Sequence, residues 1–142
     1  MKRIDLTIVN MEGTLTEEET RADKLYAFKA SPEYAKILTE GDVETVNLAN
    51  NHTYDYGEKS YTDTIAALDA EGIISFGNDR TAIIEIQGIK VGLLGTYELR
   101  DHMGCEAGDE DNIANLKEQG AQLILQRSTG GKSGRIFPTK PR

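Results

Sequence analysis

The chain has 142 residues, of which 38% are hydrophobic and 28% charged, and this composition is that of an ordinary globular protein with one core, not of a disordered or fibrous chain. The formal net charge is −8, but every acidic residue precedes residue 127, so residues 1–126 carry 24 acidic and 11 basic side chains. A body this acidic repels nucleic acid, and we therefore predict no nucleic-acid partner.

The first predicted element is a strand over residues 4–10. Apolar and polar side chains alternate there, as they do in a strand with one buried face. The strand leads into the polar segment Asn10-Met11-Glu12-Gly13.

A short helix is predicted next, from Ser31 to Gly41. Serine followed by proline is typical of a helix N-cap and first turn, and glycine is typical of a helix end. The apolar stripe expected to face the core consists of Tyr34, Ile37 and Leu38.

Residues 43–48 predict a second strand because they are rich in β-branched side chains, and they lead directly into Ala49-Asn50-Asn51-His52. From Ser60 the apolar residues follow a helical period, and Gly72 marks the end of that helix. This succession of strand and helix is typical of an α/β fold.

The remaining elements are predicted from shorter patterns. Residues 82–87 and 89–96 are two apolar runs joined at Gly88, which indicates an antiparallel hairpin. Residues 110–119 predict a helix with an acidic first turn, and a strand begins at residue 121. After residue 126 the composition turns basic, with little apolar periodicity, so we expect a disordered or irregular, or non-native, tail over residues 127–142.

Polar side chains gather after the two predicted parallel strands, where loops of an open α/β sheet converge. They are Asn10, Glu12, Asn50, Asn51, His52 and Asp55. Carboxylate, amide and imidazole groups suit Mn, Fe, Zn or Mg. The residues alone leave an alternative open, because an Asn-Asn-His segment can simply form a turn through local hydrogen bonds of its side chains.

Two segments resemble the CapA family of poly-gamma-glutamate capsule biosynthesis proteins. They are Asn47-Leu48-Ala49-Asn50-Asn51-His52-Thr53-Tyr54-Asp55-Tyr56-Gly57 and, upstream of it, Asn10-Met11-Glu12. Weaker similarity continues through Phe28-Lys29-Ala30, Asp63-Thr64-Ile65, Gly72-Ile73 with Phe76-Gly77, and residues 89–95. The resemblance covers about residues 4–125, and the Asn-Asn-His string is its most specific part.

The resemblance implies a partial metallophosphatase-like α/β sandwich, with parallel strands, helices and an antiparallel hairpin, and a divalent metal site like that of calcineurin-type phosphoesterases. In that family pattern Glu12 and Asn51 correspond to metal ligands. His52 corresponds to the catalytic residue that contacts the substrate oxygen or protonates the leaving group. Asn10, Asn50 and Asp55 would orient these residues.

Several ligands of the family pattern have no counterpart in the sequence. The Gly-Asp strand that precedes the first motif is missing, and so are the downstream His-Trp-Gly and His-x-His segments. We therefore expect a truncated or frameshifted fragment, with a partial domain over residues 1–126, weak or no metal binding and no turnover. A sheet cut in this way would expose an unpaired edge and favour a homo-oligomer.

Two functions from different classes follow from the resemblance. The first is a metal-dependent hydrolase acting on poly-gamma-glutamate or a phosphorylated small molecule. The second is a non-catalytic scaffold in a membrane-associated complex for capsule polymer synthesis or export. The family works at or outside the membrane, but no apolar run of about 20 residues and no signal-peptide core occurs in the sequence, so its location stays open.

Overall fold

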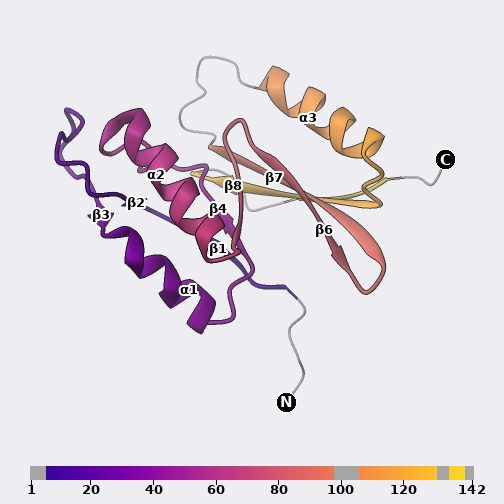
Figure 1. Ribbon diagram of the computed structural model, residues 1–142. Helices are drawn as coiled ribbons and strands as arrows, with labels where there is room; N and C mark the ends of the chain where they lie inside the picture. Colours follow the sequence, from indigo (N-terminus) through magenta and orange to yellow (C-terminus); the bar gives the residue numbers. More distant parts are fainter. Residues whose placement is uncertain (1–5, 98–105, 131–134, 140–142) are drawn as a thin grey trace. The chain divides into compact units, whose positions relative to one another are not determined.

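The computed structural model describes residues 6–97, 106–130 and 135–139, with side chains from residue 109 onward in the second of these ranges (Figure 1). The chain divides into two compact units, Met1–Ser75 and Phe76–Arg142. No helix within the described ranges is long and apolar enough to cross a membrane.

A three-stranded sheet forms the centre of the unit Met1–Ser75. It consists of β1 (Ile8–Asn10), β4 (Thr45–Asn47) and β5 (Ile74–Phe76), in the order β1-β4-β5. Strands β1 and β4 are parallel, with Asn10 beside Asn47. The two predicted strands are therefore confirmed as parallel neighbours, and their carboxyl ends lie side by side.

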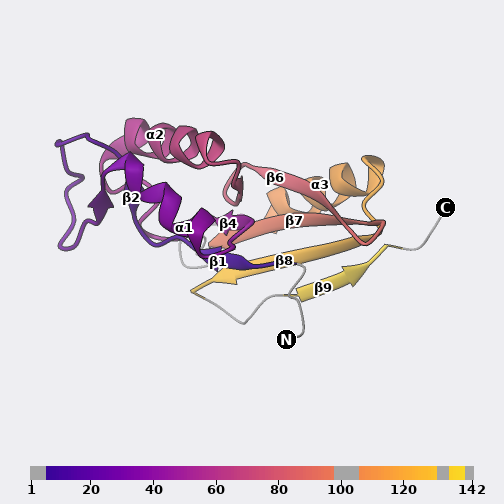
Figure 2. The same cartoon turned by 60° about the horizontal axis from the view of Figure 1, so that its bottom comes forward.

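A second, two-stranded parallel sheet follows in this unit, formed by β2 (Thr14–Leu15) and β3 (Lys29–Ala30). Helix α2 (Gly57–Ala70) buries Tyr61 and Leu68 in one apolar cluster with Val46 of β4, so that it covers one face of the larger sheet (Figure 2). The predicted helix after the second strand is confirmed, although it begins at Gly57, three residues before Ser60.

The short helix after β3 is also confirmed, but its predicted inner face is right only for Leu38, which packs against the apolar cluster, and wrong for Tyr34 and Ile37. It starts as a 3₁₀ turn, η1 (Pro32–Ala35), and continues as α1 (Lys36–Glu40). Tyr34 and Ile37 are 51% and 58% exposed, whereas Ala35 is buried. A 3₁₀ turn has about three residues per turn, so a stripe read at 3.6 residues per turn falls on the wrong face.

The unit Phe76–Arg142 is built on one four-stranded sheet, in the order β6-β7-β8-β9. Strands β6 (Thr81–Ile86) and β7 (Ile89–Tyr97) form the predicted antiparallel hairpin, and the turn residues Gln87 and Gly88 have φ values of 51° and 80°. Positive φ at both central residues is the type I′ turn that joins tightly twisted strands.

Helix α3 (Glu106–Glu118) packs on this sheet through Leu116, which is fully buried with Leu94, Ala121 and Ile124. The helix starts four residues earlier than predicted. A Cβ added at Gly92 of β7 would lie 3.1 Å from Leu116 Cδ1, so the glycine permits the close approach of helix and strand.

The predicted irregular segment after residue 126 is wrong for the described residues. Strand β8 (Leu123–Thr129) continues past that point, parallel to β7. Strand β9 (Arg135–Pro138) pairs antiparallel with it, and Phe137 packs against the cluster around Leu116. The side chains of β8 show no strand pattern after residue 126, but backbone pairing with β7 continues there and stabilises the strand. Residues 131–134 and 140–142 lie outside the described part.

The predicted mixed α/β class, with parallel strands, helices and an antiparallel hairpin, is confirmed and is consistent with a partial metallophosphatase-like fold. The buried apolar side chains form two clusters, one around Val46 and Leu68 and one around Leu94 and Leu116. The chain length predicted a single core, but the structure has two apolar clusters, one in each unit.

Candidate functional site

Three asparagine side chains join the carboxyl ends of β1 and β4. The Asn10 side-chain oxygen accepts hydrogen bonds from the amide groups of Asn47 and Asn50, both at 3.3 Å. The Asn50 amide also donates to the Met11 carbonyl at 2.8 Å, and the Asn50 oxygen accepts the His52 N–H at 2.9 Å. Asn10 and Asn50 thus fix the two polar segments against each other.

His52 lies at the centre of this arrangement and is 7% exposed. Its Nδ1 is 2.8 Å from an Asp55 carboxylate oxygen, and its Nε2 is 3.9 Å from Glu12 Oε1. Because an ionised carboxylate only accepts hydrogen bonds, Nδ1 carries the proton in the neutral ring, and Nε2, the nitrogen on the Glu12 side, is then the unprotonated one. The Phe28 ring lies against the imidazole, with the two centroids 4.5 Å apart.

Asp55 is fully buried, and its carboxylate has three donors. They are the Lys24 ammonium, the Phe28 N–H at 2.5 Å and His52 Nδ1. Burial would raise the pKa of the Asp55 carboxyl, but the hydrogen bonds from Lys24, Phe28 and His52 outweigh burial and hold this pKa below its ordinary value. Asp55 is therefore an anion at neutral pH.

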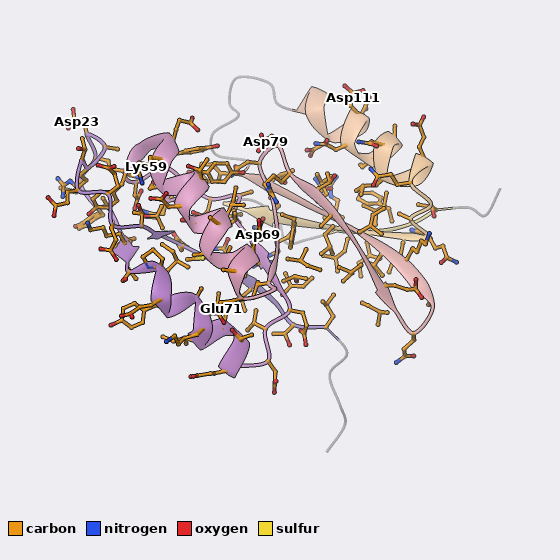
Figure 3. The ribbon with its side chains drawn as sticks, viewed as in Figure 1. Asp23, Lys59, Asp69, Glu71, Asp79 and Asp111 are labelled. Atoms are coloured by element: carbon orange, nitrogen blue, oxygen red, sulfur yellow. The ribbon has the colours of Figure 1, made fainter. Side chains whose placement is uncertain are left out.

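The connection between β2 and β3, residues 16–28, supplies two of these partners. The Lys24 ammonium also donates to the Asn51 carbonyl at 2.6 Å, and the Ala22 N–H donates to the Asp55 carbonyl at 2.8 Å. Figure 3 shows Asp23 of this connection toward the same end of the unit as Lys59, near the start of α2. Lys24 was missed from sequence because this connection has no periodicity. Phe28 lies in a segment that shares the weaker family similarity, which was a signal, but the sequence alone gave it no role in the site.

Local hydrogen bonds also shape the Asn-Asn-His segment, as the turn alternative requires. The Thr53 hydroxyl bonds to the carbonyl oxygens of Leu48 and, at 2.9 Å, Asn50. These local contacts explain Thr53, whereas the Asn50 side chain also bonds to Asn10 and Met11 on the other segment. They do not explain the orientation of His52, whose ring contacts come from Asp55, Phe28 and Glu12.

The predicted site residues are thus brought together unequally. Glu12 and His52 face each other, and Asn10, Asn50 and Asp55 support them, whereas the Asn51 residue is exposed on the loop. Among the described residues, no group of three or more His, Cys, Asp or Glu side chains is arranged to hold a metal ion. One carboxylate, one imidazole nitrogen and one amide oxygen fit part of a divalent metal site but provide fewer ligands than the four to six such ions take. The roles of Glu12, Asn51 and His52 stay predictions.

Comparison with known proteins bears on the origin of this site. The family model described as bacterial capsule synthesis protein PGA_cap matches residues 1–133, past residue 125 where the resemblance was expected to end. A probable polyglutamine synthesis accessory protein of Mycobacterium tuberculosis is 38% identical over 74 residues, which are 51% of this chain and 20% of that protein. The capsule biosynthesis protein CapA of Bacillus anthracis is 33% identical over 106 residues, 67% of this chain and 26% of that protein. The chain therefore spans a small part of the length of the curated relatives it matches.

Proposed function

The chain belongs to the bacterial capsule synthesis protein family PGA_cap, and from this premise we propose that it supplies part of a metal-dependent hydrolase site that acts on poly-gamma-glutamate or a phosphorylated small molecule. The observation that carries the proposal is the orientation of His52. Its Nδ1 is bound by buried Asp55, and its Nε2 lies 3.9 Å from Glu12.

Each residue has a distinct part in this proposal. Glu12 and Asn51 hold a divalent metal such as Mn, Fe, Zn or Mg, which when bound polarises the scissile bond and activates water. In its protonated form, with a proton on both ring nitrogens, His52 would donate from Nε2 to the substrate's phosphoryl or carbonyl oxygen, or give that proton to the leaving group. Asn10 positions Glu12 through a hydrogen bond of 3.3 Å, and Asn50 fixes the loop.

The electrostatics of the chain support a role for a cation. Residues 1–126 carry 24 acidic and 11 basic residues, so a polyglutamate chain is repelled by the surface as a whole. Glu12 is half-exposed and adds a further negative charge beside His52. A divalent ion between Glu12 and an anionic substrate would remove this repulsion at the point where His52 acts.

Paramagnetic Mn²⁺ tests the metal site, because it broadens NMR signals within a short distance of where it binds. At low Mn²⁺ we expect the signals of Glu12 and His52 to broaden before those of Asp69 and Ala70, at the end of α2 that is farther along the chain from the site. The variant Glu12→Gln should remove this selectivity, whereas Glu40→Gln, at an exposed glutamate of α1, should keep it. Equal broadening across the chain, or an unchanged response in Glu12→Gln, would contradict the proposal.

A scaffold role in polymer synthesis or export is the second candidate. It is favoured by the number of site groups already used for internal hydrogen bonds, namely those of Asn10, Asn50 and Asp55. Calorimetry with poly-gamma-glutamate separates the two functions. Binding that persists in a chelator, with no selective Mn²⁺ effect, supports the scaffold; binding that requires the metal supports the hydrolase site.

A further inference from the structure

We infer that Lys24 is a positioning residue of this site: by pairing with buried Asp55 it fixes the proton of His52 on Nδ1 and leaves Nε2 as the bare nitrogen that faces Glu12. The inference rests on the proposed function only for the catalytic role of His52. Which ring nitrogen carries the proton is a property of the chain whether or not it hydrolyses a substrate.

The buried Asp55 carboxylate needs a cation as its partner. Its side chain is fully buried, and a buried carboxylate is stable only when it is paired and hydrogen-bonded. Lys24 is the only lysine or arginine side chain that forms a salt bridge with Asp55 in the described structure. The two oxygens are divided, with Oδ1 bound to Lys24 and Oδ2 bound to the Phe28 N–H and His52.

Contacts with the loop after β4 hold Lys24 beside Asp55. Lys24 belongs to the irregular connection between β2 and β3, so its position depends on its contacts and not on a helix or strand. Its ammonium bridges Asp55 to the Asn51 carbonyl at 2.6 Å, and the neighbouring Ala22 N–H binds the Asp55 carbonyl. Lys24 thus joins this connection to the loop that carries His52.

The Lys24–Asp55 pair decides which nitrogen of the His52 imidazole carries the proton. A neutral imidazole in water carries its proton mainly on Nε2, so a proton held on Nδ1 has to be imposed by an acceptor. Asp55 is that acceptor, at 2.8 Å. Without Lys24 the charge of the buried carboxylate is uncompensated at Oδ1, so Asp55 takes up a proton or turns toward solvent. The first outcome weakens the acceptor that holds the proton on Nδ1, and the second removes it.

Lys29 provides a matched control in the same part of the chain. Its ammonium donates to the Glu18 carbonyl at 2.7 Å and lies 5.0 Å from the centre of the Tyr56 ring. It has the same charge and length as Lys24 but makes no described contact with Asp55. Replacing Lys29 therefore removes a lysine without disturbing the Asp55 pair.

Nitrogen NMR of the imidazole ring tests the inference. The chain has two histidines, so His102→Gln leaves His52 as the only signal, which we would record about two pH units above the ordinary imidazole pKa. We expect bare Nε2 and protonated Nδ1 in the parent and in Lys29→Met. Lys24→Met should lose this form as the major species, and Lys24→Arg should restore it because the charge returns.

The inference is overturned if folded Lys24→Met keeps the parent pattern, or if the parent itself carries its proton on Nε2. Circular dichroism reports whether Lys24→Met folds. If it does not, Lys24→Gln, which retains a donor without charge, replaces it in the same measurement with the same expected loss. A parent pattern as expected, in a chain with no selective Mn²⁺ response, would remove the proposed function and leave the role of Lys24 standing.

Discussion

The two units of the chain have interiors of different kinds. Of the twelve buried polar or charged side chains in the described structure, eleven lie in Met1–Ser75 and one, Ser128, lies in Phe76–Arg142. The second unit instead buries aliphatic side chains against its sheet, with Leu94, Leu116 and Ile124 fully buried. Apolar packing has no preferred direction, whereas hydrogen bonds fix the orientation of each group they join.

This difference explains why the candidate site is in the first unit. A site needs side chains held in one orientation by neighbours that are themselves fixed. Asn10, Asn50 and Asp55 provide such neighbours for His52 and Glu12. The first unit is also more sensitive to substitution, because each buried polar group loses stability when its specific partner is removed. The two interiors should therefore respond to different perturbations.

The largest effect is expected from Leu116→Ala in the second unit. Removing this fully buried side chain should lower the free energy of unfolding by about 2–5 kcal/mol, because it leaves a cavity between α3 and β7. Hydrogen exchange measured by mass spectrometry should show the loss in peptides of β7 and β8. An equal loss of protection around β1 and β4 would show that the two interiors are not separate.

A smaller effect is expected from Asp55→Asn in the first unit. Asparagine keeps one acceptor oxygen for the donors Lys24, Phe28 and His52 and no longer buries a charge, so the bonds are weakened and not all lost. The free energy of unfolding should fall by about 1–2 kcal/mol, roughly the difference between a charged and a neutral hydrogen bond. Protection from exchange should fall in residues 16–28 and in the loop after β4, but not in β7. Asp63→Asn serves as the control at a partly exposed carboxylate; an equal response in this variant would remove the special place of Asp55.

Acid should weaken the first unit before the second. The pKa of Asp55 is lowered on folding although burial opposes this, because Lys24, the Phe28 N–H and His52 bind its anionic form. A lowered pKa stabilises the fold above the unfolded value near about pH 4, and this stabilisation is lost as the pH falls through the folded pKa. Methyl NMR signals of Val46 should therefore change at a higher pH than those of Leu94. Loss of both together would contradict the comparison.

The smallest effect is expected from Lys59→Ala. Its ammonium pairs with Asp63 at 2.7 Å, one helical turn away on α2, and is largely exposed to solvent. Exposed pairs of this kind contribute little because water and salt screen them. The melting temperature should be unchanged within error, in contrast to Asp55→Asn. A clear drop would mean that charge pairs on the surface, and not buried ones, maintain this unit.

Much of the fold could be predicted because local patterns decide it. The alternation before Asn10, the helical period between Ser60 and Gly72, and the glycine at the Gln87-Gly88 turn each correspond to an observed element. The errors arose where tertiary contacts override local preference. The 3₁₀ turn rotated Tyr34 and Ile37 outward, and pairing with β8 made a strand of residues 135–138.

The sequence by itself determined the chain's family, its mixed α/β class and the positions of the Asn-Asn-His loop and of Glu12, because these depend on residue types at fixed spacing. Only the tertiary structure decided that Lys24 and Phe28 meet Asp55 and His52. They are separated by 31 residues in one pair and 24 in the other, and an irregular connection has no pattern from which its contacts can be read. The connection is held in place by the contact of Lys24 with buried Asp55, and the burial of Asp55 exists only in the folded chain.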